Sequence, residues 1–233
     1  MKKYLSIFLS SVLSGFCITF GATVYLLCIK MGSGTQIASL MKFLGASMFG
    51  IGLFTIIHFS LWLYTGKVGY VLDNKPIYLL SLVVCFIGNT LGSMFMSFLL
   101  LQTNQGESLK EIATPIVEAK LNSTPLSIFI MSCLCGVMIY LAVEGHKKCS
   151  YTLGKVLFAF MPIILFILCG FEHVVANVTY FTYAQIFSWK AFGYFVLMFF
   201  GNACGSIIFD LMLKGVTYFN KKKEEKEDEK LVN

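Results

Sequence analysis

Residues 170–177 are Gly-Phe-Glu-His-Val-Val-Ala-Asn, and they interrupt a long apolar segment of the sequence. That segment runs from Val156 to Cys169, and only a short apolar remnant follows the interruption. Ionisable residues inside such a segment are costly, and they usually mark a functional site. Glu172 and His173 therefore make this octapeptide the first candidate site in the chain.

The composition around the octapeptide is that of an integral membrane protein. Of the 233 residues, 57% are hydrophobic and only 13% are charged, with a mean hydropathy of +0.78. A soluble domain carries about a quarter of its residues as charged side chains, so a soluble globular protein is excluded. The high apolar content also excludes a disordered chain. A helical span needs about 20 apolar residues, so the chain can hold roughly six spans.

Six apolar tracts are predicted to be these spans, at residues 4–29, 36–65, 77–101, 124–143, 153–171 and 189–219. Six spans place both termini on one side of the membrane. Thirteen lysines would lie on that side, namely Lys2, Lys3, Lys67, Lys75, Lys147, Lys148, Lys155, Lys214 and five in the tail, against five on the other. The positive-inside rule then puts both termini in the cytoplasm. We expect a multi-pass plasma-membrane protein with one domain, residues 1–220, and a charged cytoplasmic tail, residues 221–233.

The two halves of the chain resemble each other. The hexamer Gly-Asn-Thr-Leu-Gly-Ser at 88–93 matches Gly-Asn-Ala-Cys-Gly-Ser at 201–206, 113 positions later, and a weaker match relates residues 21–26 to residues 136–141. Each half, about 4–102 and 124–219, holds three predicted spans. Because three is odd, the second half enters the membrane from the opposite side, as in the inverted repeats of many transporters.

The middle span of each half contains a polar break. In the first half the break is predicted at Tyr64-Thr65-Gly66-Lys67, and in the second half it is the octapeptide. Non-helical backbone at membrane depth occurs only where it lines a cavity, and paired breaks in two halves indicate a transport site. The predicted fold is therefore an all-α integral membrane protein. Its six transmembrane helices form two inverted three-helix repeats, with the second and fifth helices broken by pore loops as in aquaporins.

The octapeptide resembles the GFEHxxAN signature of the formate/nitrite transporters. Leu63-Tyr64-Thr65-Gly66 is similar to the LFTG loop of that family, and Gly201-Asn202 to its sixth span; the resemblance covers about Tyr4 to Tyr218. It implies a homopentamer with one pore per subunit. It also implies transport of small monovalent anions of weak acids, such as formate, nitrite or hydrosulfide.

The resemblance implies roles for polar residues of the path. His173 matches the central pore histidine of the family, Thr65 the threonine that faces it, and Lys120 a lysine of the vestibule. Lys120 is expected to attract the anion, and His173 to supply or share a proton, because histidine exchanges a proton near neutral pH. Asn202 is expected to line the path. Import should then be favoured at lower external pH.

Two apolar constrictions are also implied by the resemblance. Leu53 and Phe166 fall at their positions, with Phe49 one turn before Leu53. Leu53 and Phe166 are 113 positions apart, like the repeated hexamers, and are expected to be symmetry mates. A bare anion would face a cost of tens of kcal/mol in such a ring, reduced by relaxation and water. Protonating a carboxylate with a pKa near 4 costs only roughly 4 kcal/mol at pH 7.

Two departures from the family pattern bear on function. Gly136 follows Cys135 where many members have asparagine, so one polar pore contact is expected to be missing. The chain also begins almost at the first span, without the amphipathic helix proposed to gate some relatives, so such gating is not expected. Glu172 is interpreted as making a structural hydrogen bond or a subunit contact, and His58 as packed or at an interface.

Other classes of function fit the sequence less well. No HExxH, GxSxG or cofactor fingerprint occurs, so an enzyme, a metal site and a cofactor are not expected. The eight cysteines lie almost all in apolar runs and are interpreted as small buried side chains. The net charge of +6 is explained by orientation in the membrane rather than by nucleic-acid binding. Proton-coupled symport of acetate- or lactate-type acids and a neutral-solute pore stay open as alternatives, although the Asn-Pro-Ala loops of aquaporins are absent.

Overall fold

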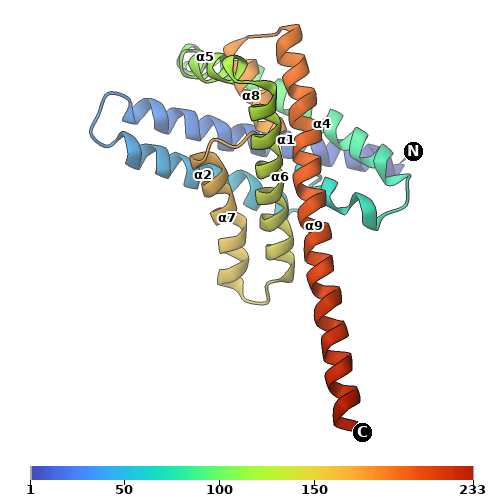
Figure 1. The fold of residues 1–233 in the computed structure, drawn as a ribbon. Helices are drawn as coiled ribbons and strands as arrows, with labels where there is room; N and C mark the ends of the chain where they lie inside the picture. Colours follow the sequence, from blue (N-terminus) through green and yellow to red (C-terminus); the bar gives the residue numbers. More distant parts are fainter. Residues whose placement is uncertain (1, 233) are drawn as a thin grey trace.

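The regular structure of the chain is helical throughout residues 2–232, whose backbone the computed structural model describes together with the side chains of residues 2–223 (Figure 1). The helices are α1 (Lys2–Gly32), α2 (Ala38–His58), α3 (Tyr64–Lys67), the 3₁₀ helix η1 (Val68–Asp73), α4 (Tyr78–Leu101), α5 (Gly106–Asn122), α6 (Pro125–Lys148), α7 (Thr152–Leu168), α8 (Val174–Ala184) and α9 (Trp189–Val232). Each predicted apolar tract thus contains one long helix.

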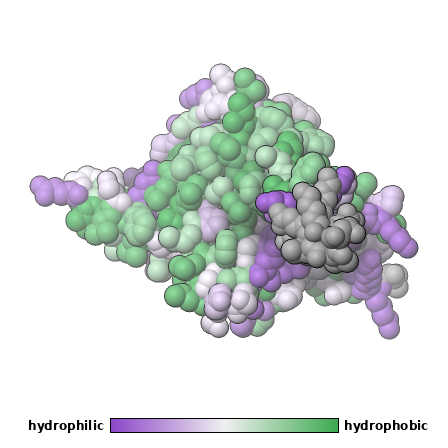
Figure 2. Space-filling model, turned by 60° about the horizontal axis from the view of Figure 1, so that its bottom comes forward, coloured by the Kyte–Doolittle hydropathy of each residue, from purple (hydrophilic) through white to green (hydrophobic). Residues whose placement is uncertain are grey.

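Five of these helices, α1, α2, α4, α6 and α9, are long and apolar enough to cross a membrane by length and composition. The sixth, α7, has 17 residues, near the lower limit of about 17 residues for a span. Apolar residues also cover much of the surface in Figure 2, where a soluble protein would carry charges. This distribution suits a protein whose helices face lipid or other apolar partners.

The helices form two groups that cross each other. Helix α1 packs against α2 and α4, whereas α6 packs against α7 and α9, and the groups meet where α2 contacts α7. In Figure 1 the α1–α2 pair runs across the α6–α7 pair, and α9 projects well beyond the other helices toward the C-terminus. The charged tail thus continues the last helix.

The two groups repeat one contact in detail. A Cβ atom on Gly15 would lie 2.5 Å from the Asn89 carbonyl oxygen, and one on Gly136 would lie 2.2 Å from that of Asn202. Glycine is required at both positions because the backbones of paired helices touch there. The weaker sequence match was wrong, since it aligns Gly136 with Gly21. Gly21 instead approaches the backbone of Phe49.

The predicted chain breaks lie in the second and fifth tracts, but the first is displaced. Helix α2 ends at His58, so the break is at residues 59–63 and precedes the Tyr64–Lys67 segment, which is itself helical. The second break, residues 169–173, begins one residue before the octapeptide. Each break contains one left-handed residue that turns the chain, Ser60 with φ 54° and Gly170 with φ 71°.

Helix α5 was not predicted, since it lies between the third and fourth predicted apolar tracts. Leu109, Ala113 and Val117 recur every four residues and are all buried, so one face of α5 belongs to the core. Helix α5 packs against α8, which follows the second break. This packing brings Lys120, near the end of α5, to the second break.

Candidate pore between two cavities

The side chains of Thr65 and His173 join the two chain breaks. Thr65 belongs to α3, His173 immediately precedes α8, and the distance from Thr65 Oγ1 to His173 Nε2 is 2.8 Å. Both residues are buried, with exposed fractions of 1% and 2%. The Ala176 backbone N–H donates to His173 Nδ1 at 3.0 Å. Because Nδ1 accepts this bond, the neutral imidazole carries its proton on Nε2 and donates it to the Thr65 hydroxyl oxygen.

Two cavities approach this pair of residues. The larger cavity, of about 890 Å³, lies among α1, α2, α5, α7 and α8, and both His173 and Phe166 line it. The smaller cavity, of about 260 Å³, lies among α2, α3 and α6, and Leu53 and Gly66 line it. Thr65 directly precedes Gly66 in the chain. The hydrogen bond from His173 to Thr65 therefore links the wall of the larger cavity to that of the smaller one.

Phe166, one of the predicted constriction residues, lies between the histidine and Phe49. The Phe166 ring lies 5.9 Å from the Phe49 ring, edge to face, and 5.9 Å from the His173 ring, stacked. Phe49, Leu53 and Phe166 are all buried. Phe166 and Leu53 face different cavities, so apolar side chains flank the His173 position on both sides.

The symmetry expected for the two constrictions was wrong. Phe166 accepts a hydrogen bond from the Phe171 backbone N–H, and Ile56 accepts the matching bond from Leu61, both at 2.9 Å. Phe166 therefore corresponds to Ile56, 110 positions earlier, rather than to Leu53. The offset between the halves changes from 113 at the repeated hexamers to 110 at the breaks because the connecting segments differ in length.

Asn202 does not occupy the place that the sequence suggested. Its Nδ2 donates to the carbonyl oxygens of Ser132 and Glu172, both at 2.8 Å, and its Oδ1 accepts from the Val174 N–H at 2.9 Å. It is fully buried and is not among the residues that line either cavity. Its amide is fully used in holding the second break, so the expectation that it lines the path is corrected.

Lys120 lines the larger cavity, as expected for a vestibule residue, but it has an ionic partner. Its Nζ lies 2.5 Å from Oε2 of Glu172, and the side chains are only 15% and 7% exposed. Asn177 Nδ2 also donates to this carboxylate oxygen at 2.8 Å. Glu172 thus makes the hydrogen bond expected of it, and it offsets the charge of Lys120.

The sequence of the whole chain decides its family. Residues 1–222 match the sequence profile described as formate/nitrite transporter. The chain belongs to the formate/nitrite transporter family. Together with its long apolar helices, this makes it a multi-pass membrane protein of an anion-transporting family.

Known transporters and channels are similar to the chain over most of its length. YrhG, an uncharacterized transporter of Bacillus subtilis (strain 168), is 28% identical over 204 residues, which cover 81% of this chain and 76% of YrhG. The formate channel FocA of Haemophilus influenzae is 26% identical over 189 residues, covering 76% and 65%. A solved pentameric formate channel with formate bound superposes with a TM-score of 0.78 at 21% identity, covering 95% and 98%. This last likeness shows a shared fold.

Gly136 does not leave a gap in the pore of this family member. The position faces the Asn202 backbone, which a Cβ atom would meet at 2.2 Å, and it lines neither cavity. The expectation of a missing polar pore contact was therefore wrong for this chain. An asparagine here would collide with α9 rather than reach a substrate.

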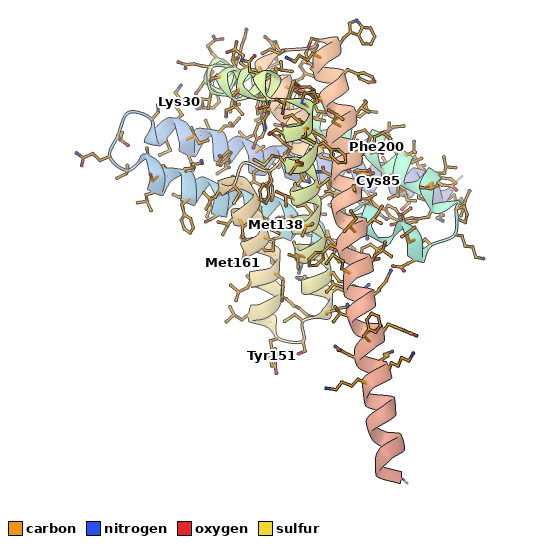
Figure 3. All side chains as sticks on the ribbon, viewed as in Figure 1. Lys30, Cys85, Met138, Tyr151, Met161 and Phe200 are labelled. Carbon is orange, nitrogen blue, oxygen red and sulfur yellow. The ribbon has the colours of Figure 1, made fainter. Side chains whose placement is uncertain are left out.

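Sequence reasoning missed several residues of the larger cavity. Asn177, the last residue of the octapeptide, lines this cavity, and its Oδ1 is buried without a hydrogen-bond partner in the described part of the chain. Lys30 and Lys42 line it as well, and Lys30 donates to Ser108 of α5 at 2.6 Å. Figure 3 shows Lys30 near α5, at the opposite end of the molecule from Tyr151 in the α6–α7 turn. The resemblance of the octapeptide to the family signature was the one available signal for Asn177.

The described side chains offer no assembled metal site. Among residues 2–223, no three histidine, cysteine, aspartate or glutamate side chains are grouped closely enough to hold an ion. The eight cysteines are free thiols, of which Cys28, Cys85 and Cys135 are buried and Cys169 is exposed.

Proposed function

We propose that the chain carries small monovalent anions of weak acids, such as formate, nitrite or hydrosulfide, through a pore in each subunit of a homopentamer. The observation that carries this proposal is the His173–Thr65 hydrogen bond, buried between two cavities. An ionisable side chain buried within membrane-spanning segments is costly and usually marks a substrate or ion pathway. A histidine paired with a hydroxyl group at this depth therefore favours a role in transport over a purely structural one. The relatives described as formate channels favour the same class of substrate.

Polar donors at the centre would recognise an anion as it sheds water. With Nε2–H of His173 donating to Thr65, the Thr65 hydroxyl proton is free to donate to a carboxylate or nitrite oxygen. The imidazole can give a whole proton to the anion only after it has gained one at Nδ1, and this would break the bond from Ala176 N–H. Sharing a hydrogen bond therefore requires less rearrangement than transferring a proton.

The apolar side chains on either side of the histidine would select the neutral form of the substrate. Phe49, Phe166 and Leu53 offer no hydrogen bond to an anion, and a bare charge in such surroundings is costly. A weak acid passes more cheaply once it holds a proton. Flux should therefore rise as the pH on the entry side falls, and import should be favoured at lower external pH.

The lysines would define the two mouths of the pore. Lys30, Lys42 and Lys120 line the larger cavity, whereas Lys67 and Lys147 line the smaller one. The first three belong to the set expected outside and the last two to the set expected in the cytoplasm. We infer that the larger cavity opens to the outside and the smaller one to the cytoplasm, with both termini cytoplasmic in a plasma-membrane protein.

The remaining architecture follows the same proposal. The helices around α1 and those around α6 would be inverted repeats within residues 1–220, followed by the cytoplasmic tail, residues 221–233. Helix α4 leaves Leu80, Ile87 and Leu91 exposed along one face, which suits lipid or a neighbouring subunit. A match to a pentameric fold supports the five-subunit assembly.

Anion flux into liposomes tests the proposal. Protein reconstituted in liposomes should carry formate and exclude glycerol in a swelling assay, and His173→Gln should abolish formate flux or its dependence on pH. His58→Gln is the matched control, because His58 is exposed at the end of α2 and lines neither cavity. Unchanged formate flux and pH profile in His173→Gln would contradict the mechanism. Proton movement in step with acetate or lactate would instead favour symport.

A further inference from the structure

The smaller cavity combines apolar walls with basic side chains. Lys67, His146 and Lys147 line it, whereas none of its described lining residues is acidic. The His146 ring donates from Nδ1 to the Lys155 carbonyl oxygen at 3.0 Å, which leaves Nε2 for another partner. Positive charge in a concave, partly apolar site raises the local concentration of small anions.

Lys67 has no carboxylate partner among the side chains of residues 2–223. Its Nζ lies 5.4 Å from the centre of the Trp62 ring, and its backbone carbonyl accepts from the Tyr78 hydroxyl at 3.0 Å. The side chain is half-buried, at the edge of the first break. An ammonium group that is partly removed from water and lacks a counter-ion gains strongly from an anion beside it.

Lys147 is only weakly engaged by its nearest carboxylate. Glu144 Oε2 lies 3.8 Å from Lys147 Nζ, and this oxygen already accepts from the Tyr70 hydroxyl at 2.7 Å. The other carboxylate oxygen lies 3.2 Å from Lys148. Glu144 is thus largely satisfied by other groups, and Lys147, whose Nζ lies 5.2 Å from the centre of the Tyr70 ring, lines the cavity without a short ion pair.

The larger cavity differs in this respect. Lys120, which lines it, is paired with Glu172 at 2.5 Å, whereas Lys67 of the smaller cavity has no carboxylate partner among the described side chains. We propose that the smaller cavity holds an anion-binding site of its own, in which Lys67 and Lys147 bind the small monovalent carboxylate or nitrite that the pore carries. This inference rests on the proposed function, since it names a second site for the same substrate.

If the smaller cavity holds such a site and the larger one does not, the rate of transport should depend on its direction. Anion entering from the smaller cavity would be concentrated by Lys67, so flux in that direction would saturate at a lower concentration. The effect should fade with salt, because the screening length falls from about 30 Å at 0.01 M to about 3 Å at 1 M. Removal of the Lys67 charge should therefore matter most in dilute solution.

Formate flux through pentamers inserted in one orientation in liposomes of neutral phosphatidylcholine tests the site, because an acid that crosses in its neutral form carries no current. Formate at about 0.01 M is supplied to one side and then to the other, so the two directions are compared. Lys67→Met should lower the flux that enters from the smaller cavity by about fivefold, the factor that corresponds to about 1 kcal/mol of attraction at 4 Å in water. Lys67→Arg should keep the flux, and all variants should converge at about 1 M. Lys75→Met, which removes an exposed lysine outside the cavity, is the matched control.

The outcomes separate the two proposals. Formate flux in the wild type, with Lys67→Met showing the same flux as the wild type in both directions at low concentration, would overturn the second site and leave the proposed function intact. No formate flux in the wild type would overturn the proposed function itself. An effect of Lys67→Met that appears only when anionic lipid is added would also overturn the second site, because the lysine would then be binding a lipid headgroup.

Discussion

Asn89 and Asn202 make the same three hydrogen bonds in the two parts of the molecule. Each Oδ1 accepts a backbone N–H just after a chain break, from Tyr64 or from Val174. Each Nδ2 donates to one carbonyl oxygen within the break region and to one on a neighbouring helix. The N–H groups and the carbonyl oxygens of the break regions lie outside regular helix bonding, so the two amides replace their missing partners. The bonds to Ser11 of α1 and Ser132 of α6 tie each break to a neighbouring helix. The polar residues of the repeated hexamers thus act as supports for the site.

Asn202→Ala should lower stability rather than alter selectivity. It leaves the Val174 N–H and the Glu172 carbonyl oxygen unpaired, at about 1–3 kcal/mol for each buried group. Thermal denaturation of the purified protein in detergent measures the loss, with Asn104→Ala at an exposed position as control. A variant of normal stability whose anion preference has changed would show that Asn202 contacts the substrate after all.

Gly136→Asn should prevent folding, although it restores the residue that many family members carry. Its Cβ atom would lie 2.2 Å from the Asn202 carbonyl oxygen, a backbone atom that cannot move aside cheaply. The yield of monodisperse protein in size-exclusion chromatography should drop sharply. Gly193→Asn is the control, because no atom lies within 4 Å of a Cβ atom there. A well-folded Gly136→Asn protein would return position 136 to the list of pore residues.

Thr65→Val should reduce formate flux while the protein stays folded. Valine has the shape of threonine, but it removes the acceptor for the His173 Nε2–H, which is left unpaired in a buried site. The cost of about 1–3 kcal/mol for such an unpaired group, if it falls on the transporting state, corresponds to a loss of formate flux of about fivefold to a hundredfold. Thr65→Ser keeps the hydroxyl and should retain most of the flux. Equal flux in liposomes for Thr65→Val and the wild type would mean that this hydroxyl takes no part in transport.

The sequence predicts the long helices well, because lipid demands an apolar run of fixed length and such runs are visible without any contact information. The second break was located by its glycine and its charged residues. The first was placed too late, because Ser60 adopts a left-handed conformation that no glycine announces. Helix α5 was missed, although Leu109, Ala113 and Val117 repeat with a helical period that a search limited to long apolar runs does not detect.

The sequence predicted which residues form the candidate site better than it predicted their hydrogen-bond and ion-pair partners. Thr65 and His173 were expected to face each other, and the structure brings them within 2.8 Å. Asn202 and Gly136 were misassigned because a polar or small residue in a membrane helix can serve a neighbouring backbone as well as a substrate. Which of these two roles such a residue takes depends on which helices pack against each other. The ion pair of Lys120 with Glu172 likewise depends on the packing of α5 against α8, which the sequence pattern does not reveal.

The Lys120–Glu172 pair should respond unequally to the loss of either partner. Glu172→Gln removes the charge that masks Lys120, so the larger cavity becomes more positive and formate flux should saturate at a concentration about fivefold lower, equivalent to about 1 kcal/mol. Lys120→Met instead leaves a carboxylate that is only 7% exposed, with Asn177 as its one remaining donor among the described side chains, and should cost about 3–5 kcal/mol of stability.

The double variant Lys120→Met/Glu172→Gln should regain most of that stability, because neither charge is then left alone. Thermal denaturation and the concentration dependence of formate flux, measured for all four proteins, separate the two effects. Glu111→Gln, which breaks the exposed pair with Lys30, should leave stability unchanged. If Glu172→Gln folds normally but needs more formate for half-maximal flux, Glu172 assists transport directly, and the view that it masks the Lys120 charge is wrong.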